Sequence, residues 1–322
     1  MEQEKILEVK NLRMYYSTLR GDVRAVDDVS FNLDKEASLG LVGESGCGKT
    51  SAMLAILKLL PWNGRIIDGE IYLDEQNILK MPDTEFRKKI RWKKVSTVFQ
   101  GAMNALHPMK TIGDQITEAI TLHGKESRKE ALKRAKDLLE LVGIRASLID
   151  RYPHELSGGM KQRCVIAMSV ACDPQLVILD EPTTALDVII AAQVLKLIIE
   201  LQKKLKLSII IVTHDLSMVS EVCDNVAVMY GGKMVEIGDI MSVYKEPLHP
   251  YSQKLISAFP SVLGPKQELQ LIPGFPPNLL EPPTGCRFHP RCPYSMDVCR
   301  KKEPPLLSRG KQHSVACHLI GD

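Results

Sequence analysis

The sequence predicts an α/β fold whose core sheet is mostly parallel, and three observations support this class. From residue 160 onwards, helix-length segments alternate with short apolar strands. One of these strands, 176–179, is a continuous apolar run, which is typical of a parallel strand buried on both faces. Near the N-terminus, a glycine-rich turn joins an expected strand at 38–42 to an expected helix at 51–60. Such alternation favours a parallel sheet covered by helices.

Local patterns predict the other elements. Apolar and polar residues alternate over 6–35, which indicates an antiparallel β layer, and a strand pair is expected near 69–73 and 95–99. Residues 111–156 are expected to be helical, and Ser127 and Glu130 have the spacing of a capping box that opens a helix. The later elements are predicted as helix 160–171, strand 176–179, helix 188–205, strand 208–212, helix 216–223, strand 225–230 and a closing edge strand at 233–238.

Composition excludes several classes of protein. The 322 residues are 44% apolar and 25% charged, as in soluble globular proteins, and the net charge of +3 does not indicate a nucleic-acid partner. The N-terminus lacks the basic and apolar regions of a signal peptide, and no apolar run is long enough to cross a membrane. We therefore expect a cytosolic protein, docked on a membrane partner. In that compartment, the eight cysteines favour metal binding or free thiols over disulfides.

Residues 43–50 form a candidate phosphate loop. They fit the pattern Gly-x4-Gly-Lys-Ser/Thr between a strand and a helix. Glycines leave room for backbone N–H groups to wrap phosphate oxygens, and the helix start adds the positive end of its dipole. Lys49 supplies a cation for the β- and γ-phosphates of ATP, and the Thr50 hydroxyl a ligand for Mg²⁺. The predicted ATP contacts here are Gly43, Glu44, Ser45, Gly46, Cys47, Gly48, Lys49, Thr50 and Ser51.

Two acids end the apolar run 176–179, where a parallel strand meets its ligand. Asp180 is expected to hold Mg²⁺, directly or through water. Glu181, one residue later, is expected to polarise the attacking water as a general base. With the phosphate loop, these acids predict a site for ATP hydrolysis.

A second helix start with the chemistry of an anion site lies at Ser157, Gly158 and Gly159. Two phosphate-binding helix starts in one chain suggest that two subunits share one ligand.

These motifs and their order resemble the ATP-binding cassette (ABC) ATPases over about residues 6–240. The resemblance makes the phosphate loop Walker A of a P-loop NTPase fold, Asp180 and Glu181 Walker B, and 157–159 the ABC signature. It implies a head-to-tail pair of subunits in which the signature of one contacts the ATP of the other. It also implies an antiparallel β subdomain and a helical subdomain at about 101–160.

The same resemblance assigns four further residues. Gln100 resembles the Q-loop residue that reaches Mg²⁺ or the water, and His214 resembles the switch histidine that donates to the γ-phosphate. Asp187 matches the D-loop and is expected to act on the partner's ATP. Tyr16 is expected to stack on adenine, with Tyr15 as the fallback.

Cys47 stands where this family usually has serine. Because it lies near Lys49 and a helix start, its thiol is expected to have a lowered pKa and to be open to oxidation.

Four of the eight cysteines cluster near the C-terminus, at Cys286, Cys292, Cys299 and Cys317. Thiolates select zinc or iron–sulfur clusters. No Cys-x2-4-Cys pair of a structural zinc site occurs here, so the spacing leaves an iron–sulfur cluster, Zn²⁺ and free thiols open.

The tail resembles that of dipeptide and oligopeptide import ATPases, through His249-Pro250-Tyr251, Pro273-Gly274-Phe275-Pro276-Pro277 and the segment 285–292. This resemblance implies a 4Fe–4S cluster on the four cysteines. It divides the chain into a nucleotide-binding domain, 1–244, and an extension, 245–322. It further implies a D-type ATPase of a dipeptide importer at the cytoplasmic face of the membrane. Its partners would be a homologous F-type ATPase or a second copy, two membrane permeases and, indirectly, an extracytoplasmic peptide-binding protein.

Other functions remain open from sequence. Relatives of this type can import nickel or another small solute, and the tail can act as a metal-cluster sensor that regulates the ATPase. A DNA-repair ABC ATPase is the alternative from a different class. It is disfavoured because the chain lacks a long coiled-coil insertion and a basic face.

Overall fold

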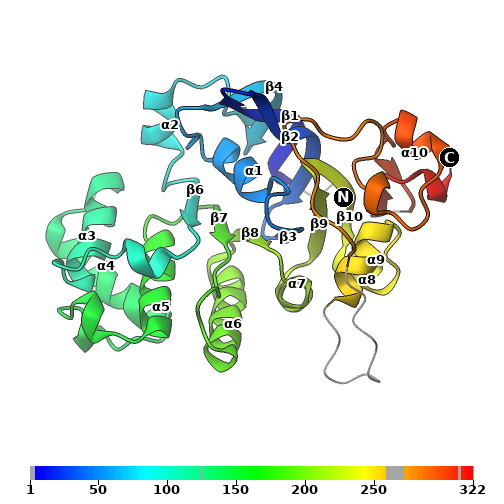
Figure 1. The fold of residues 1–322 in the computed structure, drawn as a ribbon. Coiled ribbons are helices and arrows are strands. Elements are labelled where there is room, and N and C mark those ends of the chain that lie inside the picture. Colours follow the sequence, from blue (N-terminus) through cyan, green and yellow to red (C-terminus); the bar gives the residue numbers. More distant parts are fainter. Residues whose placement is uncertain (1–3, 125, 259–271, 311–312, 322) are drawn as a thin grey trace. The chain divides into compact units, whose positions relative to one another are not determined.

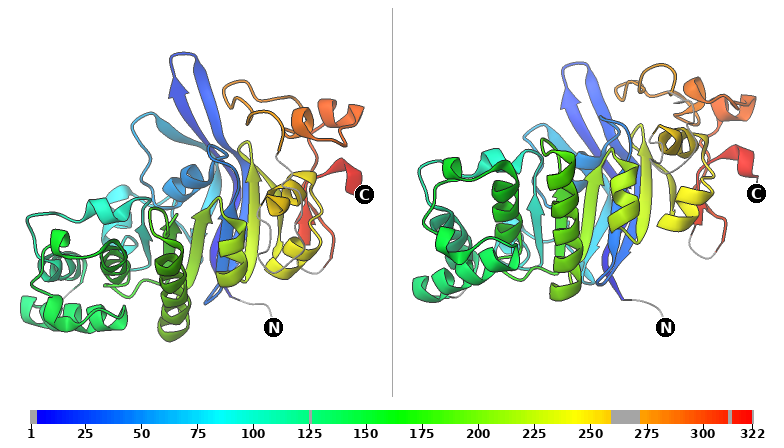
Figure 2. Two further views of the ribbon diagram at one scale, coloured as in Figure 1. Left: turned by 60° about the horizontal axis from the view of Figure 1, so that its bottom comes forward. Right: turned by 90° about the horizontal axis from the view of Figure 1, so that it is seen from below.

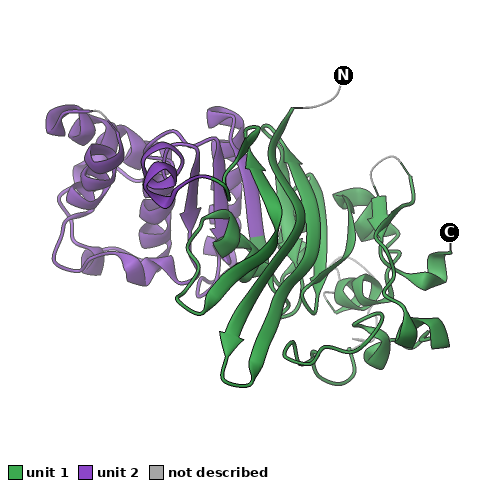
Figure 3. Ribbon diagram, turned by 90° about the horizontal axis from the view of Figure 1, so that it is seen from above, with its two compact units in different colours: residues 1–80, 212–322 green, residues 81–211 purple. Residues whose placement is uncertain are grey.

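The computed structural model describes residues 4–124, 126–258, 272–310 and 313–321. The chain divides into two compact units (Figure 3). Unit 1 comprises residues 1–80 and 212–322, and unit 2 comprises residues 81–211. The chain passes from unit 2 back to unit 1 along β8 (Ser208–Thr213).

An antiparallel layer forms the first part of unit 1. β1 (Lys5–Thr18) and β2 (Gly21–Asp34) make a long hairpin, which Figure 2 shows as a twisted ribbon. β4 (Gly64–Leu73) pairs with the other side of β1, and β5 (Gln76–Asn77) pairs with β4. The antiparallel layer expected over 6–35 is therefore confirmed.

A second sheet in unit 1 carries the phosphate loop. β3 (Ser38–Val42), buried along its whole length, runs parallel to β9 (Asn225–Tyr230), and β10 (Lys233–Asp239) returns antiparallel to β9. β12 (His313–Val315) pairs with the other side of β10, and β11 (Leu307–Ser308) with β12. The expectation that 233–238 closes the sheet is wrong, because the extension adds two strands beyond it.

The described part of unit 1 also contains five α-helices (Figure 1). They are α1 (Lys49–Ile56), α7 (Leu216–Val222), α8 (Ile240–Lys245), α9 (Pro250–Ser257) and α10 (Asp297–Lys301). Of these, α7 packs against β3, and α8 packs against β9 and β10. Gly40 shows how tight the packing is, since a Cβ built on it would lie 2.2 Å from Cγ1 of Val219 on α7. A side chain at position 40 would therefore push α7 away from β3.

Unit 2 contains parallel strands and the longest helices of the described residues. β6 (Val95–Val98) runs parallel to β7 (Leu176–Asp180). The expected pairing of 69–73 with 95–99 is wrong, because β4 pairs with β1 and β5. The α-helices of this unit are α2 (Asp83–Lys89), α3 (Ile112–His123), α4 (Arg128–Leu141), α5 (Gly158–Ser169) and α6 (Val188–Leu205).

The capping box predicted before α4 is confirmed. The Ser127 N–H donates to Oε2 of Glu130 at 2.9 Å, and the Glu130 N–H donates to Oγ of Ser127 at 3.4 Å. Two backbone donors at the helix start are thus satisfied by side chains. None of the helices in the described residues has the length and apolar character needed to span a bilayer.

The buried carboxylate of Glu236 on β10 anchors both ends of the extension. Its oxygens accept hydrogen bonds from the N–H groups of Leu248 (2.7 Å) and His249 (2.9 Å). Oε1 also lies 2.7 Å from Nε2 of His313 on β12. Because an unpaired buried carboxylate is costly, these bonds tie the extension firmly to the sheet.

His249 is buried and uncharged at the start of α9. Its Nδ1 accepts a hydrogen bond from the Tyr251 N–H at 3.0 Å, and burial lowers its pKa from 6.5 to about 3. A second proton on this imidazole would occupy the accepting nitrogen and place a positive charge in the core.

We therefore expect acid to destabilise the fold through His249. Above pH 6.5, the pKa of this histidine in the unfolded chain, His249 is neutral in both states and does not lower the free energy of unfolding. Below that pH the unfolded state binds a proton that the folded state does not, so the free energy of unfolding falls as the pH decreases towards about 3. The slope is about 1.4 kcal/mol per pH unit. His249→Asn keeps a capping acceptor but cannot titrate. Urea unfolding at several pH values should give this variant a flatter profile than the wild type, and equal slopes would contradict the prediction.

Candidate functional site

The phosphate loop has a backbone that only glycine adopts easily. Gly43, Gly46 and Gly48 have φ values of 151°, 78° and 109°. A Cβ on Gly43 would lie 2.2 Å from the Met229 carbonyl oxygen, and one on Gly48 would lie 2.1 Å from that of Ala25. Positions 43 and 48 therefore require glycine for two reasons: the backbone has a positive φ, and a neighbouring carbonyl leaves no room for a Cβ.

The helix that follows the loop begins without a side-chain cap. Gly48 is the N-cap of α1 and makes no side-chain hydrogen bond, whereas Thr111, Ser127 and Ser157 cap α3, α4 and α5 with their hydroxyl groups. An anion at the start of α1 would supply the acceptor that a cap supplies elsewhere, and the helix dipole favours its charge. The loop and helix start therefore fit a phosphate group.

Lys49 places its ammonium group within the loop. The side chain is mostly buried, and Nζ donates to the carbonyl oxygens of Gly43 (2.7 Å) and Glu44 (3.1 Å). Neutral carbonyls hold the cation without cancelling its charge. Lys49 is therefore available to an anion bound in the loop.

The thiol of Cys47 does not have the expected character. Lys49 Nζ lies 3.7 Å from its sulfur, which favours the thiolate. Burial outweighs this and raises the pKa of Cys47. The expectation of a lowered pKa is therefore wrong, and the thiol is buried beneath the loop.

Tyr16, rather than its neighbour, lies beside the loop helix. Its hydroxyl is 3.0 Å from Oγ of Ser51, in the first turn of α1. Tyr15 donates its hydroxyl proton to Asp27 on β2 at 2.8 Å. Successive side chains of a strand point to opposite faces, so only one of these tyrosines can face α1.

In unit 2, the acids at the end of β7 meet two polar side chains. Asp180 is 3% exposed. Oε2 of Glu181 accepts hydrogen bonds from Nε2 of Gln100 (2.7 Å) and from Oγ1 of Thr184 (2.9 Å). Glu181 also has a left-handed backbone, with φ of 47°, which costs energy for a side chain of this kind. The structure thus holds this carboxylate in a defined orientation, and Thr184 is a contact that sequence reasoning missed.

The residues expected to act on a partner's ATP meet at the starts of α5 and α6. Oγ of Ser157 accepts from the Met160 N–H at 3.3 Å, and Oδ1 of Asp187 accepts from the Ile190 N–H at 3.0 Å. A Cβ on Gly159 would lie 2.5 Å from Cγ2 of Ile190. The glycine therefore lets the two helix starts approach closely.

His214 is exposed directly after β8, in a turn held by its neighbours. The Asp215 N–H donates to Oγ1 of Thr213 at 3.0 Å, and Asp215 caps α7. The predicted site residues fall into two groups. Unit 1 contains the phosphate loop, Tyr16 and His214, and unit 2 contains Gln100, Ser157, Gly158, Gly159, Asp180, Glu181 and Asp187.

The metal-cluster prediction for the extension is wrong. Cys286, Cys292, Cys299 and Cys317 all lie in described residues and are free thiols. Within the described ranges, no group of three or more His, Cys, Asp or Glu side chains is placed to hold a metal ion. Burial raises the pKa of Cys286 to about 12 and also raises the pKa values of Cys292 and Cys317, which disfavours thiolate ligands. The structure gives no support for a 4Fe–4S cluster or for Zn²⁺ at these residues.

The extension does supply contacts to the phosphate loop that the sequence did not reveal. Nη1 and Nη2 of Arg291 form a bidentate pair with the carboxylate of Glu44, and the Tyr251 hydroxyl accepts the Glu44 N–H. Both residues lie in the tail segments noted for their resemblance to import ATPases. Nothing in that pattern indicates that they contact the loop.

Comparison with known families agrees with these motifs. Residues 26–184 match the model of the ABC transporter family, and residues 235–299 match that of the oligopeptide/dipeptide transporter C-terminal region. The dipeptide transport ATP-binding protein DppD of Bacillus subtilis (strain 168) is 45% identical over 319 residues, 98% of this chain and 95% of that protein. DppD of Escherichia coli (strain K12) is 41% identical over 317 residues, 97% of this chain and 96% of that protein.

Solved structures show the same fold. The cbiO1 subunit of the ABC transporter complex cbiONQ from Clostridium perfringens matches with a TM-score of 0.67 at 30% identity, over 76% of this chain and 92% of that one. A dimeric ATP-binding cassette in a post-hydrolysis state, bound to ADP and Pi, matches with a TM-score of 0.64 at 26% identity, over 73% and 98%. The expected P-loop fold is confirmed, and the chain belongs to the ABC transporter ATP-binding proteins of the dipeptide and oligopeptide transport family.

Proposed function

We propose that this chain hydrolyses ATP to power the import of dipeptides or oligopeptides through a membrane ABC transporter. The observation that carries the proposal is the match of residues 235–299 to the C-terminal region of oligopeptide and dipeptide transporters, in a chain that also has a complete phosphate loop. Relatives named for dipeptide transport align along nearly the whole chain. These matches favour peptides over nickel or another small solute, and over nucleic acid.

In the proposed mechanism, unit 1 holds the triphosphate. Backbone N–H groups of residues 43–51 and the Lys49 ammonium group bind its oxygens, while Tyr16 stacks on adenine. His214 donates a hydrogen bond to the γ-phosphate. Catalysis of this reaction consists mainly of positioning and charge stabilisation, which fits a preformed loop.

Unit 2 supplies the groups that act on water. Glu181 accepts the proton of the attacking water, and its bonds from Gln100 and Thr184 support this role by holding the carboxylate in a defined orientation. Thr50, Asp180 and Gln100 are the proposed ligands of Mg²⁺, and their hydroxyl, carboxylate and amide oxygens suit this hard cation. When bound, Mg²⁺ neutralises charge on the β- and γ-phosphates.

We further propose that the working ATPase is a pair. Ser157, Gly158, Gly159 and Asp187 of one subunit would contact ATP held by the other, which is either a homologous F-type subunit or a second copy. The dimeric form of a similar cassette supports this arrangement. The pair would bind two permeases at the cytoplasmic face of the membrane, through Gln100 and the helical subdomain 101–160, and receive substrate from an extracytoplasmic peptide-binding protein. Residues 1–244 would form the nucleotide-binding domain and 245–322 the importer-specific extension.

Uptake by reconstituted vesicles tests the substrate class. The chain is assembled with its permeases and binding protein, and labelled dipeptide and nickel are offered separately. We expect ATP-dependent accumulation of the dipeptide, and none when Lys49→Ala replaces the wild-type chain, because the loop loses its cation. Accumulation of nickel without peptide would contradict the proposal.

Replacing Glu181 separates hydrolysis from binding. Glu181→Gln keeps the shape and the hydrogen-bond acceptor for Gln100 but cannot accept a proton. We expect turnover to fall by about 10²- to 10⁴-fold, the range for removal of a general base, with little change in the dissociation constant of ATP. Phosphate release and equilibrium binding measure the two quantities. Retained hydrolysis would remove Glu181 from this role.

A pair of substitutions at position 16 tests adenine stacking. Tyr16→Phe keeps the ring and loses only the bond to Ser51, whereas Tyr16→Ala loses the ring. We expect Tyr16→Ala to weaken ATP binding about tenfold, since stacking on a base contributes about 1–3 kcal/mol. Tyr16→Phe should bind nearly as the wild type does. If both variants bind equally weakly, the hydroxyl contact rather than stacking is what matters.

A further inference from the structure

Arg291 of the extension binds the phosphate loop through the side chain of Glu44. Nη1 of Arg291 donates to Oε2 of Glu44 at 2.7 Å, and Nη2 donates to Oε1 at 3.0 Å. The arginine side chain is 7% exposed, and its Nε donates to the Pro273 carbonyl at 2.7 Å, which fixes the guanidinium plane. A bidentate pair of this kind is both strong and specific in orientation.

The backbone of the same residue is held as well. The Glu44 N–H donates to the Tyr251 hydroxyl at 2.8 Å. Tyr251 is fully buried and lies against Tyr230 and Phe288, with ring centroids 4.7 Å and 5.5 Å away. Position 44 of the phosphate loop is therefore held at its main chain and its side chain by two residues of the extension.

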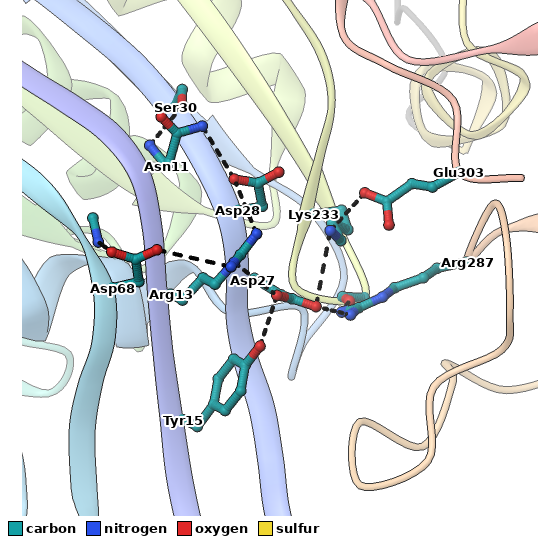
Figure 4. A network of polar contacts seen from close by, with 12 residues as sticks. Asn11, Arg13, Tyr15, Asp27, Asp28, Ser30, Asp68, Lys233, Arg287 and Glu303 are labelled. Carbon is teal, nitrogen blue, oxygen red and sulfur yellow. Dashed lines mark hydrogen bonds and ion pairs between the residues drawn. The ribbon is translucent and has the colours of Figure 1, made fainter.

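A second route connects the extension to Cys47 of the loop. Arg287 bonds to the carboxylate of Asp27 (Figure 4) and to the Gly231 carbonyl, which lies at the turn between β9 and β10. In that turn, the Gly232 N–H donates to the Cys47 carbonyl at 2.9 Å, and the Gly232 carbonyl accepts from the Asp27 N–H at 2.9 Å. The extension therefore supports both Glu44 and Cys47.

The charge of Glu44 gives the arginine contact a consequence for nucleotide binding. A carboxylate on a loop that binds a triphosphate repels its ligand unless a cation neutralises it. Arg291 supplies that cation at hydrogen-bond distance. The Glu44 carbonyl also accepts from Nζ of Lys49 at 3.1 Å, so movement of residue 44 would displace the lysine as well.

We propose that Arg291 is a positioning residue for ATP binding: it neutralises Glu44 and holds the phosphate loop in its binding form, so that the extension sets the nucleotide affinity of the ATPase. This inference rests on the proposed function of the loop. It assigns to the extension a role within the subunit that does not require a metal cluster.

The test is a double-mutant cycle on the purified full chain, with equilibrium binding of a fluorescent ATP analogue as the readout. Arg291→Ala leaves an unneutralised carboxylate in the loop, and we expect the dissociation constant to rise about tenfold, as for coupled residues in contact. Glu44→Gln in the same chain removes that charge and should restore most of the affinity. AMP competition should change less than ATP competition, because AMP carries less charge to repel.

Arg134→Ala is the matched control for lost stability. Arg134 also pairs with carboxylates and donates to a backbone carbonyl, and these partners belong to unit 2. Arg134→Ala should lower the thermal stability about as much as Arg291→Ala does, but it should leave the affinity for ATP unchanged. If Arg291→Ala does not fold, Arg291→Lys replaces it. Lysine keeps the charge but cannot form the bidentate pair, so this variant should bind ATP more weakly than the wild type.

Three results would overturn the inference: wild-type ATP affinity in the arginine variants, an equal loss in Arg134→Ala, or no restoration by Glu44→Gln. Each of these presupposes that the wild-type chain binds ATP. A wild-type chain that fails to bind or hydrolyse ATP would instead refute the proposed function, so the two failures are distinguishable.

Discussion

Two backbone carbonyls occupy the space that a Cβ would need at Gly43 and Gly48 of the phosphate loop, and this close approach ties the loop to the rest of unit 1. The carbonyl of Met229 comes from β9 and that of Ala25 from β2, so both sheets of unit 1 meet at the loop. The Gly232 N–H adds a hydrogen bond to the Cys47 carbonyl. A loop built this way is not a local motif. Its shape depends on strands that are distant in sequence, and any change that separates the two sheets also changes the phosphate site.

Elements whose signals are local were predictable from the sequence. α6 (Val188–Leu205) and β9 (Asn225–Tyr230) have the predicted bounds, because apolar periodicity and an N-cap at Asp187 lie within a few residues of them. The phosphate loop was predictable because phosphate chemistry restricts residue types at adjacent positions. The edge of the sheet was not, since β12 joins β10 from far along the chain. The pair of Arg291 with Glu44 spans 247 positions, and no local pattern indicates it.

The cysteines show a second limit of sequence reasoning. Neighbouring charge predicted a reactive thiol at Cys47, and the resemblance to import ATPases implied metal ligands in the tail, but neither property follows from the sequence pattern alone. Burial disfavours the thiolate and raises the pKa of Cys47 despite the nearby lysine. The same effect raises the pKa of Cys286 to about 12. Whether a cysteine is reactive or ligating therefore depends on its solvation and on which side chains converge, and both are properties of the fold.

The division of the site residues between the units bears on what the extension can control. The groups proposed to hold the triphosphate, from Gly43 to Ser51, belong to unit 1, whereas Gln100 and Glu181, proposed to act on water, belong to unit 2. In the described residues, Arg291 and Tyr251 contact the first group through Glu44. A contact of the extension with Glu44 would therefore act on the affinity for nucleotide. It would not act directly on the groups proposed to carry out the chemical step. In an ATPase that works by closing around ATP, setting that affinity decides how often the site is filled at a given concentration of ATP.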